Sequence, residues 1–447
     1  MTSLQKAREI AELVAQKGGR AYFVGGFVRD RLMGKKTEDI DVEIHGIEPE
    51  MLSDILEKSG KTMEIGKSFG IYSLKGYNID IALPRTERPL GSGHRDFDVK
   101  PDPHLGTLLA SKRRDFTVNS LMQDILTGEI TDHFCGRDDL EKGILRHVND
   151  ATFPQDPLRV LRLAQFASRF GFTPHEDTIE LCKKIDLSSL SSERVFDELK
   201  KALLLSEKPS VFFETLRKTD SLSQWFPELE ELIGIEQNPV YHSEGDVWTH
   251  TMMVVDEGAK LRDKVSNPLW FMLACLYHDL GKIVSTVVID GVIHAYNHET
   301  EGLPIVEKAL KRLTGEKALK KYVLNLCSLH MKPRVVAGAN SSVKTTNRMF
   351  DDATEPMDLI YISLADSRGK IPPSDEEKTM QFLLERYETF KKTMEKPYVT
   401  GQDLTENGIE PNENFKKILA HAHKLRLAGV DKESALKDTL AFAKKGR

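Results

Sequence analysis

The chain carries Thr37-Glu38-Asp39-Ile40-Asp41-Val42-Glu43 shortly after Phe23-Val24-Gly25-Gly26-Phe27-Val28-Arg29-Asp30, and this combination decides the fold of its first part. The stretch around Asp41 alternates as a β-strand does, and side chains two positions apart on a strand project from one face. Asp39 and Asp41 can therefore point in the same direction. Two carboxylates held together suit Mg²⁺, which bridges to substrate phosphates and can activate an attacking hydroxyl. The pattern indicates a site that polymerises nucleotides.

Gly25 and Gly26 suit the approach of a triphosphate. Without Cβ atoms the backbone can come close to phosphate, and a helix beginning near Phe27 would direct its N–H groups toward it. Each signal alone has an ordinary explanation, because Asp-x-Asp occurs on solvated strand edges and Gly-Gly marks many turns. Two further blocks follow in the chain, Arg113-Arg114-Asp115-Phe116-Thr117-Val118-Asn119-Ser120-Leu121 and Gln155-Asp156-Pro157-Leu158-Arg159-Val160-Leu161-Arg162.

In this order the four blocks resemble those of the class II tRNA nucleotidyltransferases, which add CCA to tRNA 3′ ends and are close relatives of bacterial poly(A) polymerases. The resemblance covers nearly the whole chain. It implies Mg²⁺ on Asp39 and Asp41 as the catalytic pair, CTP and ATP as donors, and tRNA as the acceptor. The nucleotide-binding residues that it implies are Gly25, Gly26, Arg29, Arg114, Asp115, Asn119, Asp156, Arg159 and Arg162.

The fourth block suggests how bases are chosen without a nucleic-acid template. Asp156 and Pro157 are typical of a helix N-cap and first turn, and that role alone could account for both. Arg159 falls on the same helical face as Asp156, so a carboxylate and a guanidinium stand side by side. Cytosine and adenine both present an amine beside a ring-nitrogen acceptor, an order that uracil and guanine reverse, so this pair would read C and A. A guanidinium fork also suits phosphate, and those expected on ribose or phosphate are Arg29, Arg114 and Arg162.

Two positions depart from the family pattern. Gln155 stands where relatives usually carry Glu, and Ala110 stands where an acidic residue is common. We expect Gln155 to orient Arg159 less firmly, which affects base selectivity and leaves the metal pair untouched. For Asp80, a supporting role near the metals and a charge on a surface strand fit equally well.

A second metal site is indicated by six residues ordered as in the HD-domain phosphohydrolases, namely His250, His278, Asp279, His298, His330 and Asp366. Imidazole and carboxylate ligands suit a transition metal such as Ni²⁺ or Mn²⁺, and six candidates could hold two ions that activate water on a phosphate ester. Alternatively, His298 and His330 are ordinary histidines and one ion binds. Related enzymes with this domain hydrolyse 2′,3′-cyclic phosphates and phosphate monoesters, so the resemblance implies RNA-end repair.

The predicted secondary structure changes near Gly136. Before this residue β-rich runs alternate with helical stretches, and after it helical periodicity dominates. We expect an α+β protein, with a polymerase-β-like nucleotidyltransferase head, an all-α neck and body containing an HD domain, and a helical tail. The segment from Pro89 to His104 is rich in Gly and Pro and predicts a long loop, which in the family flexes between C and A addition. The predicted domain bounds are 1–138, 139–235, 236–372 and 373–447.

Composition fits a soluble, cytoplasmic enzyme of about three or four domains for its 447 residues. The first twenty residues have the pattern of an amphipathic helix and lack the apolar core of a signal peptide, and no stretch approaches a membrane span. The four cysteines lie far apart, which favours neither a zinc knuckle nor a disulfide framework, and we expect them in the core.

The net charge of −6 argues against a surface coated for nucleic acid, yet it permits local basic patches. From Lys416 to Arg447 basic residues outnumber acidic ones. A solvated helix surface would explain this. The segment from Pro397 to Gly408 is similar to the family's C-terminal motif near tRNA, and so we predict that the tail binds tRNA.

Alternatives remain within the class and outside it. An A-adding enzyme, a CC-adding enzyme or a poly(A) polymerase would share the head, although the HD domain argues against the last. From another class, the chain could be an HD phosphohydrolase with a nucleotide-sensing head, which the intact pair of Asp39 and Asp41 disfavours. An RNA-binding protein without catalysis would leave both sets of metal ligands unexplained.

Overall fold

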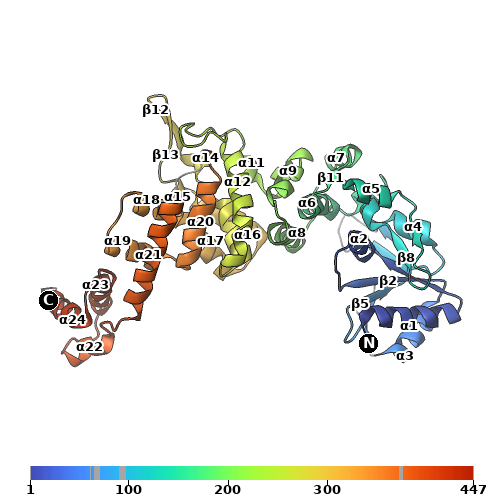
Figure 1. The fold of residues 1–447 in the computed structure, drawn as a ribbon, viewed down its shortest axis with the longest axis horizontal. Coiled ribbons are helices and arrows are strands. Elements are labelled where there is room, and N and C mark those ends of the chain that lie inside the picture. Colours follow the sequence, from blue (N-terminus) through green and yellow to red (C-terminus); the bar gives the residue numbers. More distant parts are fainter. Residues whose placement is uncertain (1, 61, 65–70, 90–96, 372–375, 446–447) are drawn as a thin grey trace. The chain divides into compact units, whose positions relative to one another are not determined.

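The computed structural model describes residues 2–60, 62–64, 71–89, 97–371 and 376–445. The chain divides into two compact units, one of residues 1–202 and 211–225 and the other of residues 203–210 and 226–447 (Figure 1). Among the described residues, no helix has the length and apolar character needed to cross a membrane.

A mixed sheet of seven strands organises the first unit, in the order β3-β4-β5-β2-β1-β8-β9. Its elements and those around it are α1 (Ser3–Gln16), β1 (Arg20–Val24), α2 (Gly26–Leu32), β2 (Ile40–His45), α3 (Pro49–Ser59), β3 (Thr62–Glu64), β4 (Ile71–Leu74), β5 (Ile79–Ala82), β6 (Arg85–Pro89), β7 (Phe97–Pro101), α4 (Thr107–Lys112), η1 (Thr117–Asn119), β8 (Met122–Asp124) and β9 (Ile130–Thr131). Strand β2 runs antiparallel to β1 and parallel to β5.

The two faces of β2 have different tasks because successive side chains alternate across a strand. Ile40, Val42 and Ile44 are buried in a core that also contains the apolar residues of α1 and α3. Asp41 and Glu43 therefore project from the opposite face. The hydrophobic pattern that anchors the strand also fixes the direction of its carboxylates.

Helices complete the first unit. The elements are α5 (Gly136–Lys142), β10 (Ile144–Leu145), η2 (Phe153–Gln155), α6 (Leu158–Phe170), β11 (Thr173–Pro174), α7 (Glu176–Cys182), α8 (Ser192–Leu205), α9 (Ser210–Lys218) and α10 (Leu222–Trp225). Helix α6 begins just after the predicted Asp-Pro start, and Asp156 Oδ1 accepts the N–H of Leu158 at 3.2 Å. Asp156 therefore accepts a backbone N–H at the start of α6, but the cap residue is Pro157 and not Asp156 as predicted.

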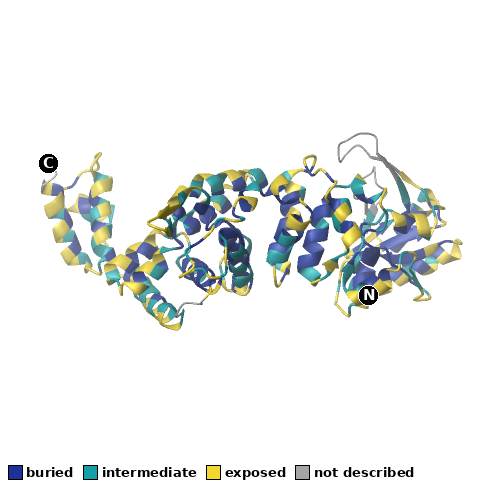
Figure 2. Ribbon diagram, turned by 90° about the horizontal axis from the view of Figure 1, so that it is seen from above, coloured by how far each residue is buried: buried dark blue, intermediate teal, exposed yellow. Residues whose placement is uncertain are grey.

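The second unit is almost entirely helical. Its elements are α11 (Pro227–Glu230), α12 (Val247–Ala259), η3 (Arg262–Lys264), α13 (Pro268–Tyr277), α14 (Lys282–Ser285), β12 (Thr286–Ile289), β13 (Val292–Ala295), α15 (His298–Glu301), α16 (Leu303–Leu313), α17 (Lys317–Leu329), α18 (Lys332–Gly338), α19 (Val343–Asp352), α20 (Pro356–Arg368), α21 (Glu376–Glu395), α22 (Gly401–Glu406), α23 (Phe415–Leu427) and α24 (Lys432–Lys445). Helix α13 is buried on nearly every side, whereas the outer helices show alternating buried and exposed faces (Figure 2).

The α+β head and helical remainder confirm the expected fold class, and two details correct the sequence analysis. The predicted loop from Pro89 to His104 is wrong for Phe97–Pro101, which forms β7 and pairs antiparallel with β6. Cross-strand pairing overrides weak strand propensity there, while residues 90–96 lie outside the described residues. The prediction that all four cysteines lie in the core is wrong for Cys135, which is exposed in the connection that precedes α5.

Helix α5 packs so closely on η1 that only glycine fits at the contact. A Cβ built on Gly136 would lie 2.2 Å from the carbonyl oxygen of Thr117, which is backbone and cannot move aside cheaply. We expect Gly136→Ala to destabilise the first unit by about 1–3 kcal/mol, measured by urea unfolding. Gly315→Ala is the control, since nothing lies within 4 Å of a Cβ there. Equal midpoints for the two variants would contradict the prediction.

Candidate active sites

Three carboxylates gather on the open face of the head sheet. Asp39 immediately precedes β2, Asp41 lies within it, and Asp80 is the partner of Asp41 in the parallel register of β5. Although Asp41 is exposed as a residue, nearby protein partly desolvates its carboxyl and raises its pKa. The charges of Asp80 and Asp39 raise that pKa further, while Arg114 opposes them. Such crowding of negative charge fits a divalent cation.

Gly25 forms the turn beside these carboxylates. Its φ of 66° and ψ of −137° belong to the region that favours glycine, and it is the cap from which α2 begins at Gly26. A Cβ built on Gly25 would lie 3.6 Å from Asp41 Oδ2 and 3.6 Å from Arg114 Nη1. Two predicted nucleotide-binding residues and one predicted metal ligand thus meet at this turn.

Glu43 holds Arg114 next to Asp41. The sequence patterns had predicted no role for Glu43. Its carboxylate accepts a hydrogen bond from Arg114 Nη2 at 3.2 Å and lies 3.0 Å from His45 Nε2 and 3.4 Å from Arg113 Nη2. Burial alone would raise the pKa of Glu43, but the hydrogen bond with His45 and the charges of the two arginines lower it to about 2. The sequence signal that could have identified Glu43 is its place two residues after Asp41, on the same face of the strand.

Four predicted nucleotide-binding residues contact one another inside the first unit. Arg29 donates through Nη1 to Asn119 Oδ1 at 2.6 Å and through Nε to Asp30 at 2.8 Å. Asn119 Nδ2 donates to Asp115 at 2.9 Å, and Arg162 Nε donates to the same carboxylate at 2.8 Å. This buried network joins α2, η1 and α6. Nucleotide contact by these four remains a prediction.

Asp156 and Arg159 each have protein partners of their own. Arg194 Nη2 lies 3.2 Å from both carboxylate oxygens of Asp156. Arg159 donates to the carbonyl oxygens of Thr152 at 2.7 Å and Arg113 at 2.6 Å. The structure therefore records no hydrogen bond between Asp156 and Arg159 in the described residues.

The two departures from the family pattern lie in different surroundings. Gln155 is exposed at the end of η2, and Ala110 is buried in α4. Because backbone carbonyls hold Arg159, its orientation does not depend on Gln155 alone.

All six predicted residues of the second metal site come together, from α12, the end of α13, α15, the end of α17 and α20, and all six are buried. Asp279 stands between two pairs of histidines. Its Oδ2 lies 3.4 Å from His250 Nε2 and 3.3 Å from His278 Nε2, and its Oδ1 lies 3.2 Å from His298 Nε2 and 3.7 Å from His330 Nε2. Asp366 Oδ1 adds a carboxylate 3.1 Å from His250 Nε2. One carboxylate could bridge two ions.

The position of the proton on each histidine ring shows which nitrogen can bind a metal ion. In His278, His298 and His330, Nδ1 lies 2.7–2.9 Å from the carbonyl oxygen three residues earlier. A carbonyl can only accept, so each Nδ1 carries a proton, and Nε2 is the nitrogen that is left for a metal ion or a second proton. The Nε2 atoms of His250 and His278 are 3.4 Å apart, as are those of His298 and His330. A cation between the paired Nε2 atoms would take the place of that second proton, and the set of four imidazoles and two carboxylates fits two metal ions.

Four further charged or polar residues surround this site. Lys282 Nζ is 2.7 Å from Asp279 Oδ2, and Lys370 Nζ is 3.0 Å from Asp366. Burial opposes ionisation of Asp279, but the positive charges of His278 and Lys282 hold its pKa well below the ordinary value. His242 and Glu244 lie behind His250. Sequence reasoning missed His242 and Glu244 because they precede α12 and belong to no periodic pattern.

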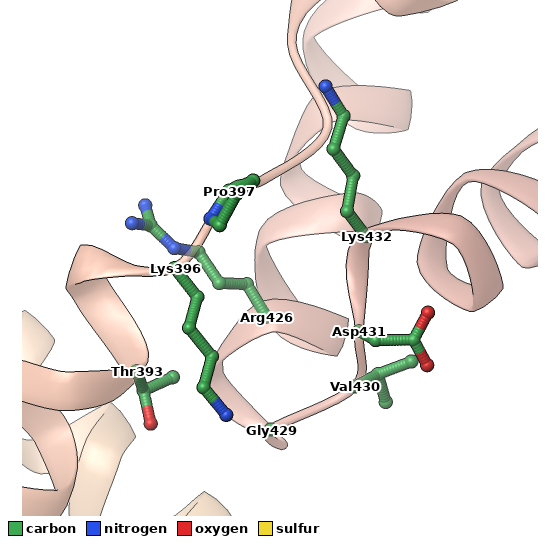
Figure 3. A pocket seen from close by; sticks show the side chains of 8 residues that line it. All are labelled: Thr393, Lys396, Pro397, Arg426, Gly429, Val430, Asp431 and Lys432. Atoms are coloured by element: carbon green, nitrogen blue, oxygen red, sulfur yellow. The ribbon is translucent and has the colours of Figure 1, made fainter.

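Two basic residues of the tail, Arg426 and Lys432, contact other residues of the tail. A cavity of about 210 Å³ is lined by Lys396, Arg426 and Lys432 among others, and their charged ends point in different directions (Figure 3). The Arg426 guanidinium lies 4.1 Å from the ring centre of Tyr398, and Lys432 Nζ lies 2.8 Å from Asp403. The binding of tRNA by the tail remains a prediction.

Family models match three parts of the chain. Residues 21–146 match the poly A polymerase head domain, residues 171–233 the probable RNA and SrmB-binding site of polymerase A, and residues 247–368 the HD domain. The head domain, its cluster of carboxylates and the histidine site together define a nucleotidyltransferase of the poly(A) polymerase type that carries an HD domain.

Relatives specify the family further. The chain is 35% identical to the multifunctional CCA protein of Pasteurella multocida over 78% of this chain and 84% of that protein. It is 32% identical to that of Alkalilimnicola ehrlichii over 85% of this chain and 92% of the relative. The chain therefore belongs to the class II CCA-adding tRNA nucleotidyltransferases with an HD domain, which confirms the resemblance seen in its motifs.

Solved structures show the same fold. The Bacillus stearothermophilus CCA-adding enzyme in complex with CTP aligns with a TM-score of 0.68 at 20% identity and covers 100% of both chains. The Thermotoga maritima CCA-adding enzyme complexed with tRNA aligns with a TM-score of 0.64 at 19% identity, covering 98% of this chain and 94% of that one.

Acid should remove the contribution of Glu43 to stability. Its pKa falls from an ordinary 4.5 to about 2, so its stabilisation is fully present above pH 4.5 and is lost as pH falls through 2. A depression of this size corresponds to roughly 3 kcal/mol. We expect Glu43→Gln to be less stable than the wild type at pH 7, with a smaller difference at pH 3, in urea unfolding at each pH. Glu57→Gln, exposed on α3, should show a difference that does not change with pH.

Proposed function

We propose that the chain adds C, C and A to tRNA 3′ ends, using CTP and then ATP and releasing pyrophosphate. The observation that carries this proposal is the gathering of Asp39, Asp41 and Asp80 beside the Gly25 turn. The relatives named CCA proteins and the enzymes solved with CTP and with tRNA support the choice of substrates. The function serves tRNA 3′ maturation and repair.

The aspartates would hold Mg²⁺, which supplies charge stabilisation and a more nucleophilic hydroxyl when it is bound. The 3′ oxygen of tRNA forms a bond to the α-phosphorus, and the bond from that phosphorus to the bridging oxygen breaks to release pyrophosphate. Gly25 and Gly26 admit the triphosphate, and Arg114, held by Glu43, offers its guanidinium to it.

The other predicted residues divide between base selection and support. Asp156 and Arg159 would read the base, which requires each to exchange a present protein contact for the nucleotide. The remaining residues proposed to contact the nucleotide are Arg29, Asp115, Asn119 and Arg162. The domain bounds proposed are 1–138 for the head, 139–235 for base and tRNA recognition, 236–372 for the HD domain and 373–447 for a tRNA-binding tail.

Nucleotide addition to defined tRNA ends tests the proposal. Transcripts ending before CCA, after C or after CC are incubated with Mg²⁺ and CTP, ATP, UTP or GTP, separately and together. We expect the shortest transcript to gain CCA and then to stop. Extension of the CC-ended transcript alone would make this an A-adding enzyme, addition of C alone a CC-adding enzyme, and long A tails a poly(A) polymerase.

The metal pair can be tested without disturbing the second unit. We expect the double variant Asp39→Ala, Asp41→Ala to lose at least about a hundredfold in nucleotide addition, because the charge that would hold the metal is removed. Its phosphohydrolase activity should be unchanged. Full nucleotide addition by this variant would refute the assignment, and addition by neither protein would favour a sensing head on a phosphohydrolase.

We propose in addition that the HD domain is a metal-dependent phosphohydrolase that acts on 2′,3′-cyclic phosphates and phosphate monoesters at RNA ends. Its metal would be a transition ion such as Ni²⁺ or Mn²⁺, since four imidazole nitrogens with two carboxylates suit such ions. The gathering of four histidine Nε2 atoms around Asp279 supports this second proposal.

Replacing the shared carboxylate should separate the two activities. We expect Asp279→Asn to lose hydrolysis of 2′,3′-cyclic AMP in the presence of Ni²⁺ or Mn²⁺, because both proposed ions lose their common ligand. Nucleotide addition to the tRNA transcripts should continue at the wild-type rate. Hydrolysis that survives this change and prior chelation would contradict the HD proposal.

A further inference from the structure

Glu244 contacts the back of one metal-site histidine. Its side chain is buried, and its Oε1 lies 3.1 Å from His250 Nδ1. The same oxygen is 2.7 Å from His242 Nδ1, and the other carboxylate oxygen accepts the N–H of Ile371 at 2.9 Å. Two donors other than His250 therefore fix this carboxylate in place.

This contact determines which nitrogen of His250 faces the ions. Its Nδ1 lies between two acceptors, Glu244 and the carbonyl oxygen of Gly369 at 3.0 Å. Nδ1 must carry a proton, so Nε2, which faces Asp366 and Asp279, is the nitrogen left for a metal ion. A carboxylate behind a ligating imidazole also raises the basicity of the ring and strengthens its bond to a metal.

The other three histidines are held differently. Each has a backbone carbonyl at Nδ1, as described above. Glu299 lies 3.8 Å from Nδ1 of His298, beyond hydrogen-bond distance. Among the described residues, His250 is thus the only one of the four whose Nδ1 has a carboxylate oxygen within 3.1 Å in addition to a backbone carbonyl.

We propose that Glu244 is a positioning residue that makes the two metal positions unequal. The tighter position comprises His250, His278, Asp279 and Asp366, and the weaker one comprises His298 and His330 with the shared Asp279. The tighter position has four ligands and a carboxylate-backed histidine, whereas the weaker one has three ligands and neutral carbonyls behind its rings. This inference rests on the proposal that the HD domain binds two ions.

Metal titration of the full chain tests it without reference to activity. The protein is stripped with a chelator, and Co²⁺ and Ni²⁺ binding are followed by calorimetry and by the Co²⁺ absorption spectrum. We expect two steps for the wild type. Glu244→Gln should weaken the tighter step by about 10- to 100-fold and leave the weaker step unchanged, because only the former contains His250.

Glu299→Gln is the matched control, since it makes the same chemical change next to His298 without a hydrogen bond to that ring. Both steps should keep their wild-type affinities. His242→Phe retains a ring against His250, which lies 5.0 Å away between ring centres, and removes an N–H that holds Glu244. His242→Phe should therefore also weaken the tighter step. If Glu244→Gln does not fold, the result for His242→Phe decides whether Glu244 has a positioning role.

The outcomes separate this inference from the HD proposal. Two wild-type steps with unchanged affinities in Glu244→Gln would overturn the positioning role alone. Equal weakening of both steps, together with a lower melting temperature of the metal-free protein, would also overturn it, because Glu244 would then be merely structural. A wild type that binds neither ion would overturn the HD proposal and this inference with it.

Discussion

The register of β2 in the head sheet is the constraint on which the nucleotidyltransferase site depends. Ile40, Val42 and Ile44 are buried against α1 and α3, and a slip by one residue would turn these apolar side chains to solvent and the carboxylates to the core. The parallel pairing of β2 with β5 then places Asp80 beside Asp41. The hydrophobic core therefore aims the charged residues without contacting them.

Both sites hold like groups closer together than they would remain in water. In the head, neighbouring carboxylates raise the pKa of Asp41. In the HD domain, paired histidine Nε2 atoms lie 3.4 Å apart. Rigid elements prevent both clusters from spreading apart, and a cation is the simplest way to reduce the repulsion. Lys282 and Lys370 contribute part of that positive charge, and in a metal-loaded site they would be available to a phosphate group.

Much of this could be predicted from the sequence where chemistry follows local pattern. Alternation placed the strand around Asp41, and residue type and order identified the six HD residues, which the fold does bring together. Contacts between distant segments could not be predicted in this way. The hairpin of β6 and β7 depends on cross-strand pairing, and the clamp of Glu43 on Arg114 joins residues 71 positions apart. Glu244 reaches His250 through a loop that has no periodicity.

Contacts between distant segments also explain why the arrangement of the base-selecting residues could not be predicted from helical spacing alone. Helical spacing puts Asp156 and Arg159 on one face, but Arg194 and two backbone carbonyls hold them in the described structure. These partners keep both groups oriented before a nucleotide arrives, so binding costs less side-chain entropy. They also compete with the base, and only a base that returns hydrogen bonds to both groups offsets the contacts it displaces. With Asp156 and Arg159 in the proposed base-reading role, selectivity for C and A would arise from this exchange, because a base with the reverse order of donor and acceptor would leave both groups unpaired.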